Sequence, residues 1–255
     1  MTLLKVYNVS KSFGGLMAVN DVNFEVSEGT VMGLIGPNGA GKTTVFNLIT
    51  GNYKPDSGEI IFSGKNITGL SPNKIVKLGI ARTFQTIRLF QNRSVLENVL
   101  AGCHCRMRAG VLACMFQPGW QKQEEHQAVK NAFQELRFVG LEKEVNNQAK
   151  NLSYGNQRLL EIARALATRP KLLILDEPAG GMNEQETQAL VRLIDQIKKR
   201  GITILLIEHD MSLVMKICEK IVVLEHGTKI AEGTAEQIKA DPQVIEAYLG
   251  WEEDD

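Results

Sequence analysis

The sequence contains no apolar run long enough to cross a bilayer, which takes about 20 residues. Residues 1–7 are strand-like and contain no apolar core of the kind that a secretory signal needs. The chain also has no net charge, because 29 basic residues balance 29 acidic ones, so no bulk field draws it to nucleic acid or anionic lipid. We therefore expect a soluble protein whose role at a membrane, if any, passes through a partner.

Cysteine is scarce too, with Cys103, Cys105, Cys114 and Cys218. Three of these lie with His104 in one short stretch, which raises the alternative of a metal site. Structural zinc sites space their cysteines two to four residues apart and need a second ligand pair, which this sequence does not supply. The pattern favours ordinary reduced thiols, as in a cytosolic protein.

A glycine-rich loop at residues 36–44 follows the apolar residues 31–35 and precedes the apolar residues 45–49. A strand, a glycine-rich turn and a helix start are the setting of a phosphate-binding loop. Backbone without Cβ atoms can wrap around phosphate oxygens, and a helix start adds N–H groups and the positive end of its dipole. The loop consists of Gly36, Pro37, Asn38, Gly39, Ala40, Gly41, Lys42, Thr43 and Thr44.

Two side chains of this loop carry specific chemistry. Lys42 can reach the β- and γ-phosphates as a point charge, and the hydroxyl of Thr43 can ligate Mg²⁺. The alternative is an ordinary strand–helix turn with an incidental lysine, but spacing, residue types and flanks all argue against it. The sequence therefore predicts that the protein binds a nucleoside triphosphate.

The chain of 255 residues can form one large α/β domain or two small ones. Residues 3–31 alternate apolar and polar side chains, which predicts an antiparallel β layer. Phe13 lies in a turn of this layer, where it either stacks on adenine or covers the sheet. Residues 86–165 indicate a helical insertion; within it, the mixed residues 110–120 form either a partner surface or, as we favour, internal packing.

A helix is predicted to begin after Ser153 and to end before Pro170. Ser153 in the cap position and Gly155 make its start a second anion-binding helix N-terminus or, equally well, an ordinary N-cap. One face of the helix is apolar, and three charged residues fall outside that face. The apolar positions are Leu159, Ile162, Ala163 and Leu166, and the charged ones are Arg158, Glu161 and Arg164.

Two apolar stretches, residues 171–175 and 202–207, are too continuous for half-exposed strands and indicate central strands of a parallel sheet. Asp176 and Glu177 end the first: Asp176 would hold Mg²⁺ through water, and Glu177 would accept a proton from the attacking water. His209 follows the second, and its place at a strand end favours a reactive role over a structural one.

Ligands of open α/β sheets lie outside the carboxyl ends of the strands. We therefore expect polar side chains from five segments to converge on one phosphate. These are Lys42, Gln85, Asp176, Glu177 and His209.

Together, these features resemble the ATP-binding subunit of ATP-binding-cassette (ABC) transporters over nearly the whole chain. Beyond the phosphate loop and the strand of Asp176 and Glu177, several motifs match in order. Phe13 stands where that family has its adenine-stacking aromatic, Gln85 matches the Q-loop glutamine, residues 152–156 the signature motif, residues 180–183 the dimer-contact loop, and His209 the switch histidine.

Finer matches resemble the branched-chain amino acid importer subfamily. They are residues 13–19, 82–85 and 241–250, with Tyr154 replacing the usual glycine of the signature. The long insertion through residues 101–125 is similar to the LivG-type subunit. Two departures, Asn156 for glutamine in the signature and Asn183 for aspartate in the dimer loop, bear on the dimer interface and not on ATP binding.

The resemblance implies an α/β fold: a P-loop NTPase core of the ABC ATPase type with a mainly parallel central sheet, an antiparallel β subdomain and a helical subdomain insertion. It implies a single ABC ATP-binding domain over residues 1–255. The core would comprise residues 1–85 and 166–235, the helical subdomain residues 86–165, and a C-terminal helical tail residues 236–255.

For the site, the resemblance implies ATP and Mg²⁺ as cofactors. Glu177, His209 and Gln85 would act in hydrolysis, and Thr43, Gln85 and Asp176 would hold the metal. Two ATP molecules would be sandwiched between two such subunits, so that Ser153 and Gly155 of one subunit would complete the phosphate site of the other.

For the function, the resemblance implies an ATP hydrolase that powers uptake of branched-chain amino acids from the cytoplasmic face of the cell membrane. Its partners would be membrane-spanning permease subunits, a second identical or homologous ATPase subunit and, indirectly, a periplasmic or extracellular substrate-binding protein. Urea, amides or other amino acids are alternative cargoes. A soluble ABC ATPase acting on ribosomes or nucleic acid is the other alternative, which one cassette, the absence of heptads and bulk neutrality do not favour.

Overall fold

The computed structural model describes residues 1–106 and 119–249, with side chains left undescribed at 106, 119, 120 and 249. Cys114, most of the mixed stretch 110–120 and the acidic end 252–255 lie outside the described residues. Within the described part, no helix is long and apolar enough to span a membrane.

The central sheet has six strands in the order β10-β9-β3-β8-β7-β6. Its neighbours pair in parallel except for the antiparallel β9–β10 hairpin, which confirms the expected mainly parallel core. Every residue of β3, β7 and β8 is buried, as expected for strands covered on both faces. The strands are β3 (Val31–Ile35), β6 (Ile80–Arg82), β7 (Leu172–Asp176), β8 (Thr203–Ile207), β9 (Lys220–Glu225) and β10 (Thr228–Gly233).

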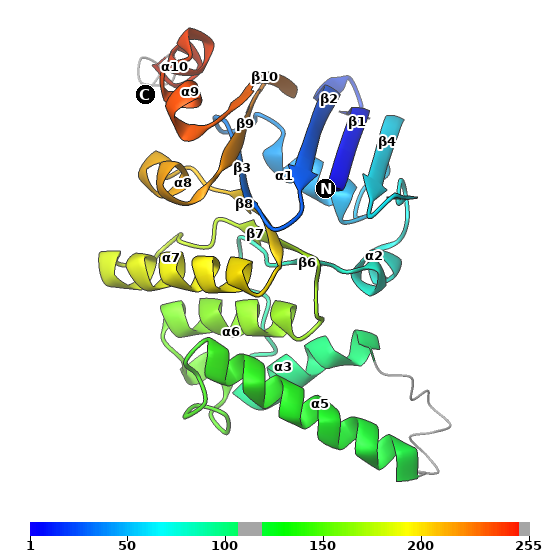
Figure 1. Cartoon of the computed structure of the whole chain (residues 1–255), viewed down its shortest axis with the longest axis vertical. Helices are drawn as coiled ribbons and strands as arrows, with labels where there is room; N and C mark the ends of the chain where they lie inside the picture. Colours follow the sequence, from blue (N-terminus) through cyan, green and yellow to red (C-terminus); the bar gives the residue numbers. More distant parts are fainter. Residues whose placement is uncertain (107–118, 250–255) are drawn as a thin grey trace.

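A second, antiparallel sheet has the order β2-β1-β4-β5 and confirms the predicted β layer. Helix α1 (Lys42–Ile49) and this sheet share one hydrophobic cluster with one face of the central sheet. In Figure 1 this layer lies at one end of the molecule, beside α1. Its strands are β1 (Thr2–Phe13), β2 (Leu16–Ser27), β4 (Ser57–Phe62) and β5 (Lys65–Asn66).

The opposite end of the molecule is helical (Figure 1). Helices from this end pack with the other face of the central sheet in a second hydrophobic cluster. The helices there are α3 (Val95–Cys103), α5 (Gly119–Phe138) and α6 (Tyr154–Leu166), with short 3₁₀ turns at His104–Arg106 and Ala149–Asn151. Helix α2 (Pro72–Leu78) precedes β6, and α7 (Glu184–Lys199) joins β7 to β8.

Sequence signals placed several helix ends correctly. Helix α6 begins after Ser153 and ends before Pro170, as predicted. At the start of α7, Asn183 closes a capping box with Glu186. Ser71 stands at the N-cap of α2 but makes no side-chain cap bond, because its hydroxyl donates to the side-chain oxygen of Asn73 at 2.6 Å.

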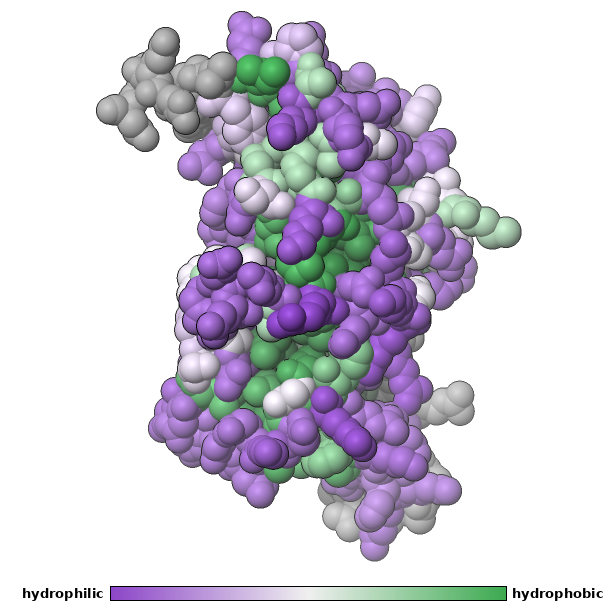
Figure 2. Space-filling view, turned by 60° about the vertical axis from the view of Figure 1, so that its left-hand side comes forward, coloured by the Kyte–Doolittle hydropathy of each residue, from purple (hydrophilic) through white to green (hydrophobic). Residues whose placement is uncertain are grey.

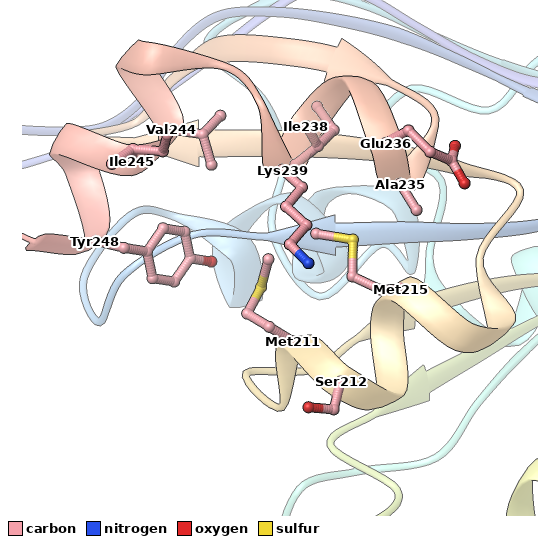
Figure 3. Close-up of a pocket in the computed structure, with 10 residues that line it drawn as sticks. All are labelled: Met211, Ser212, Met215, Ala235, Glu236, Ile238, Lys239, Val244, Ile245 and Tyr248. Atoms are coloured by element: carbon pink, nitrogen blue, oxygen red, sulfur yellow. The ribbon is translucent and has the colours of Figure 1, made fainter.

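The chain ends in two short helices, α9 (Ala235–Lys239) and α10 (Pro242–Leu249), which lie near α8 (Met211–Ile217). Between them lies an apolar groove in which Met211 and Met215 face Ile238, Val244 and Tyr248 (Figure 3). Figure 2 shows apolar surface on this side of the molecule, interrupted by a hydrophilic band.

Helices α3 and α6 cross closely at Gly102. A Cβ atom there would lie 2.2 Å from the backbone oxygen of Arg164, so Gly102→Ala must displace backbone. Alanine favours a helix by about 1 kcal/mol over glycine, but overpacking costs roughly 1–3 kcal/mol, so we expect a net loss of about 1 kcal/mol in the free energy of unfolding. Urea denaturation measures this loss. Gly15→Ala, where no heavy atom lies within 4 Å, is the matched control, and equal stability of the two variants would contradict the packing argument.

Candidate functional site

A cleft opens where the phosphate loop, the β1–β2 turn and the carboxyl ends of the central strands meet. Its volume of about 530 Å³ lies within the range of small-molecule sites, roughly 300–1,000 Å³. The cleft is lined by Phe13, Leu16, Met17, Ala18, Asn38, Gly39, Ala40, Gly41, Lys42, Thr43, Thr44, Gln85, Glu177 and His226.

The phosphate loop needs its glycines because neighbouring backbone lies against it. Gly36 has a φ of 147°, and a Cβ there would lie 2.0 Å from the backbone oxygen of Leu224. Gly41 has a φ of 97°, and a Cβ there would lie 2.4 Å from the backbone oxygen of Ala18. Gly41 also starts α1 without a side-chain cap, which leaves the helix N-terminus suited to an anion.

Lys42 folds over this loop. Its ammonium group donates to the backbone oxygens of Gly36 at 2.6 Å and Pro37 at 2.8 Å. Burial lowers the pKa of Lys42, while the negative charges of Glu177 and Asp176 act in the opposite direction. The cation therefore lies near both carboxylates at the head of the cleft, where it can meet phosphate oxygens.

Gln85, Glu177 and His209 come together as the strand-end argument requires. The Gln85 amide donates to Glu177 Oε2 at 2.9 Å, and His209 Nδ1 lies 3.6 Å from Glu177 Oε1. Glu177 adopts a left-handed backbone with a φ of 47°, which is costly for a residue with a Cβ atom. Its N–H still pairs with Ile207 in the neighbouring strand, so the turn out of β7 holds this carboxylate in place.

Asp176 lies directly before this turn and is buried. Its carboxylate is 2.6 Å from the guanidinium of Arg82, a residue of β6 to which sequence reasoning gave no individual role. Oxygen donors are what Mg²⁺ prefers, and it commonly takes one or two carboxylates together with substrate phosphates. The hydroxyl of Thr43, the amide oxygen of Gln85 and the carboxylate of Asp176 form a donor set that fits this ion.

The cysteines show no metal site within the described residues. No group of three or more His, Cys, Asp or Glu side chains in residues 1–106 and 119–249 could hold a metal. Cys103, Cys105 and Cys218 form no disulfide with one another, and burial raises the pKa of Cys218 to about 12, which keeps it a neutral thiol.

Ser153 and Gly155 lie outside the cleft. The Ser153 hydroxyl caps α6 by accepting the N–H of Asn156 at 3.3 Å. A Cβ at Gly155 would lie 2.4 Å from a carboxylate oxygen of Glu186, so this helix start packs against the start of α7. The start of α6 is therefore capped by its own chain and lies apart from the residues that line the cleft.

Arg158 and Glu161, which fall outside the apolar face of α6, are nevertheless buried. Both side chains are only 1% exposed and pair with each other at 3.1 Å. Arg158 also donates to the backbone oxygens of Phe84 at 2.6 Å and Gln85 at 2.8 Å. The segment around Gln85 thus covers the polar face of α6, which an apolar periodicity cannot reveal.

Two aromatic side chains complete the description of the cleft. Phe13 is 41% exposed, its ring meets that of Tyr53 edge to face at 5.1 Å, and the Lys11 ammonium lies 5.5 Å from its ring centre. His226, which no motif in the sequence singled out, also lines the cleft. His226 lies in the turn between β9 and β10. The next residue of this turn, Gly227, donates its N–H to the backbone oxygen of Ala40 at 3.2 Å, which holds the turn against the phosphate loop.

Comparison with protein families gives two matches. A model described as "ABC transporter" matches residues 19–180. A second, described as "Branched-chain amino acid ATP-binding cassette transporter", matches residues 228–250, which include β10, α9 and α10 beside the apolar groove.

Known proteins are similar over nearly the whole chain. The high-affinity branched-chain amino acid transport ATP-binding protein LivG of Escherichia coli K12 is 46% identical, over 97% of this chain and 98% of that protein. The ADP conformation of MJ1267, an ATP-binding cassette of an ABC transporter, is 37% identical with a TM-score of 0.86, covering 98% of this chain and 99% of that one. The dimeric cassette MJ0796 bound to ADP and Pi is 26% identical with a TM-score of 0.77, covering 91% and 99%.

A buried carboxylate, Glu208, lies directly before His209. It is 1% exposed and accepts the N–H of Ala179, in the segment after Glu177, at 2.9 Å. Burial raises the pKa of Glu208, and the hydrogen bond from Ala179 opposes this rise. Glu208 thus joins the turn that carries Glu177 to the turn that carries His209.

We expect Glu208→Gln to change how stability depends on pH. A raised carboxyl pKa in the folded state gives stability that is fully present below the ordinary value of 4.5 and is lost as pH rises through the folded value. The side chain of the variant at position 208 cannot ionise, so the variant does not lose this stability. The difference between its free energy of unfolding and that of the wild type should therefore shift in favour of the variant from pH 4.5 to pH 8. Urea unfolding at a series of pH values measures the difference. The exposed Glu28→Gln is the control, and parallel curves for Glu208→Gln and the wild type would refute the prediction.

Proposed function

This chain belongs to the ABC transporter family, and on that premise we propose that it is the ATP-binding and ATP-hydrolysing subunit of an importer for branched-chain amino acids. The cleft carries the first part of this proposal, because the phosphate loop, Lys42, Gln85 and Glu177 meet in it. The cargo is supported by the match of residues 228–250 and by the similarity to LivG over 97% of the chain.

In this proposal the chain's own residues divide the work of hydrolysis. The phosphate loop and Lys42 bind the phosphates, and Phe13 offers its exposed ring to the base. Glu177 accepts the proton of the attacking water. Gln85, 2.9 Å from Glu177, and His209, 3.6 Å from it, hold that carboxylate in position.

Thr43, Gln85 and Asp176 are the residues that would hold Mg²⁺. When bound, the ion neutralises charge on the phosphates. The protein would supply these oxygen donors from three segments, namely the start of α1, the loop after β6 and the end of β7.

The active unit is a pair of such subunits. Ser153 and Gly155 lie at a helix start that does not line the cleft of their own chain. Facing a second subunit, this helix start would supply N–H groups and a hydroxyl to the partner's γ-phosphate. The dimeric form of MJ0796 with ADP and Pi supports such a pairing.

Membrane-spanning permease subunits are the second partner. The helical region, residues 86–165, is proposed as the subdomain that binds them, between a core of residues 1–85 and 166–235 and a tail of residues 236–255. This region contains a surface groove, and Phe90 is exposed there. The groove could make both apolar and charged contacts with a permease, because it is also lined by Arg93, Glu97, Leu100 and His104. The subunit would then work on the cytoplasmic face of the cell membrane and meet a substrate-binding protein only through the permease.

Uptake by the reconstituted importer tests the cargo. We expect proteoliposomes containing this subunit, its cognate permease subunits and binding protein to accumulate labelled leucine, isoleucine or valine only when ATP is enclosed with the subunit. Urea, acetamide and a polar amino acid are the competing cargoes. ATP-driven uptake of one of these without leucine would overturn the cargo, and co-purification with ribosomes in place of permease would overturn the transport role.

Hydrolysis and binding should separate at Glu177. Glu177→Gln removes the proton acceptor but leaves the phosphate loop intact, so we expect ATP affinity to be retained and turnover to fall by about 10²-fold or more. Fluorescent-nucleotide binding and phosphate release measure the two quantities. Glu184→Gln, an exposed change at the start of α7, is the control. Near-normal turnover of Glu177→Gln would refute the role of the carboxylate.

A further inference from the structure

We propose that Arg82 is a positioning residue that sets the geometry of the magnesium site by joining Asp176 to helix α1. This inference rests on the proposed function, because Asp176 and Thr43 matter to the metal only if the cleft binds a magnesium nucleotide. Arg82 itself lines no part of the cleft as described above, so it would act through the residues it holds.

Arg82 makes a two-armed bridge from the middle of the molecule. One arm, Nη2, lies 2.6 Å from Oδ2 of Asp176. The other, Nη1, donates to Oδ1 of Asn47 at 2.7 Å and lies 3.5 Å from Oγ1 of Thr50. One planar guanidinium therefore touches the end of β7 and the body of α1 together, which a lysine cannot do with a single ammonium group.

The acceptor on α1 lies on the face of the helix that carries the metal-holding hydroxyl. Asn47 follows Thr43 by four residues, and residues four apart lie one above the other on a helix. A fixed Asn47 therefore fixes the side of α1 from which Thr43 points. Through Arg82, this side is held at a set distance from Asp176.

The bridge has little freedom to move. The guanidinium carbon lies 5.6 Å from the ring centre of Phe46 and 5.2 Å from that of Phe84. The side chains of Arg82 and Asp176 are 7% and 5% exposed. A buried cation without its carboxylate is strongly unfavourable, so this pair is retained unless both charges find other partners.

The consequence for the metal follows from the oxygens of Asp176. Arg82 donates to Oδ2 of Asp176, so that Oδ1 is the oxygen we propose for the metal. The backbone is held as well, since the Asp176 N–H donates to Thr83 Oγ1 at 3.3 Å. Partners that orient a metal-holding carboxylate in this way typically change metal affinity by about 10–100-fold when they are removed.

Two other roles would give different results. A simple cross-link between β6, β7 and α1 would affect folding and nucleotide binding alike, without singling out the metal. A competing cation that the metal must displace would lower metal affinity in the wild type, so its removal would raise that affinity.

The test measures metal and nucleotide binding without turnover. Arg82→Gln and Arg82→Lys are titrated with a fluorescent ATP analogue in excess EDTA, then with Mn²⁺ at saturating ATP, following bound Mn²⁺ by electron paramagnetic resonance. We expect the affinity of Arg82→Gln for the ATP analogue in EDTA to stay within about twofold of the wild type. The Mn²⁺ concentration at half-saturation should rise by about 10–100-fold. The Mn²⁺ midpoint of Arg82→Lys should rise less, because the lysine keeps the positive charge but can bind only one of the two partners, Asp176 or Asn47.

Arg88→Gln is the matched control, since Arg88 stacks on the same Phe84 ring at 4.3 Å but takes no part in the ion pair with Asp176. An unchanged or lowered Mn²⁺ midpoint for Arg82→Gln would overturn the proposal. A loss of affinity for the ATP analogue in EDTA as large as the loss of Mn²⁺ affinity would overturn it too. If Arg82→Gln does not fold, Asn47→Ala removes the α1 arm alone and must still raise the midpoint. A wild-type protein that binds neither the ATP analogue nor Mn²⁺ at saturating ATP would refute the proposed function itself. The wild type therefore separates a failure of the proposed function from a failure of the role of Arg82.

Discussion

The close approach of the phosphate loop to neighbouring backbone is the constraint on which the rest of the structure depends. Gly36 lies against Leu224 at the end of β9, and Gly41 lies against Ala18 in β2, so the loop is held between the two sheets. Hydrogen bonds from Gly227 to Ala40 and from Asn20 to Gly227 close the same junction. Because Cβ atoms at Gly36 and Gly41 would lie within 2.4 Å of a carbonyl oxygen, the loop can exist only with glycine there. The antiparallel layer is thereby part of the nucleotide site and not an appendage to it.

Buried charged groups link the remaining segments of the site. Arg82 holds Asp176, Arg158 holds the backbone around Gln85, and Glu208 holds the turn after Glu177. Each of these groups contacts a different strand end or loop, so the segments around the cleft cannot shift independently. Burying such groups is costly unless they are paired, and each one here has a partner at 2.6–2.9 Å. Their cost is consistent with selection for position more than for stability.

Sequence reasoning succeeded where local signals suffice. The extent of α6 followed from an apolar period, a polar cap at Ser153 and the proline at 170, and the continuous apolar runs located β7 and β8. It gave no sign that Arg158 and Glu161 are buried, because the burial of polar residues depends on partners elsewhere in the chain. Arg82 and Asp176 are 94 positions apart in the chain, so no pattern along the sequence could pair them. His226 was missed for the same reason, since its hairpin reaches the cleft only through the packing of β9 beside β3.

The start of α6 is the part of the proposed paired site that lies outside the cleft of its own chain. Ser153 caps this helix, and Gly155 packs against Glu186 at the start of α7, so the helix start is fixed by its own chain on a surface apart from the cleft. Arg158 lies one turn further along the same helix. Moving the helix start to the cleft would break the contacts of Arg158 with Phe84 and Gln85. The same contacts fix the helix start relative to Gln85. A second subunit that presses on this helix start would therefore act on the Gln85 segment directly, and through Gln85 on Glu177, 2.9 Å away.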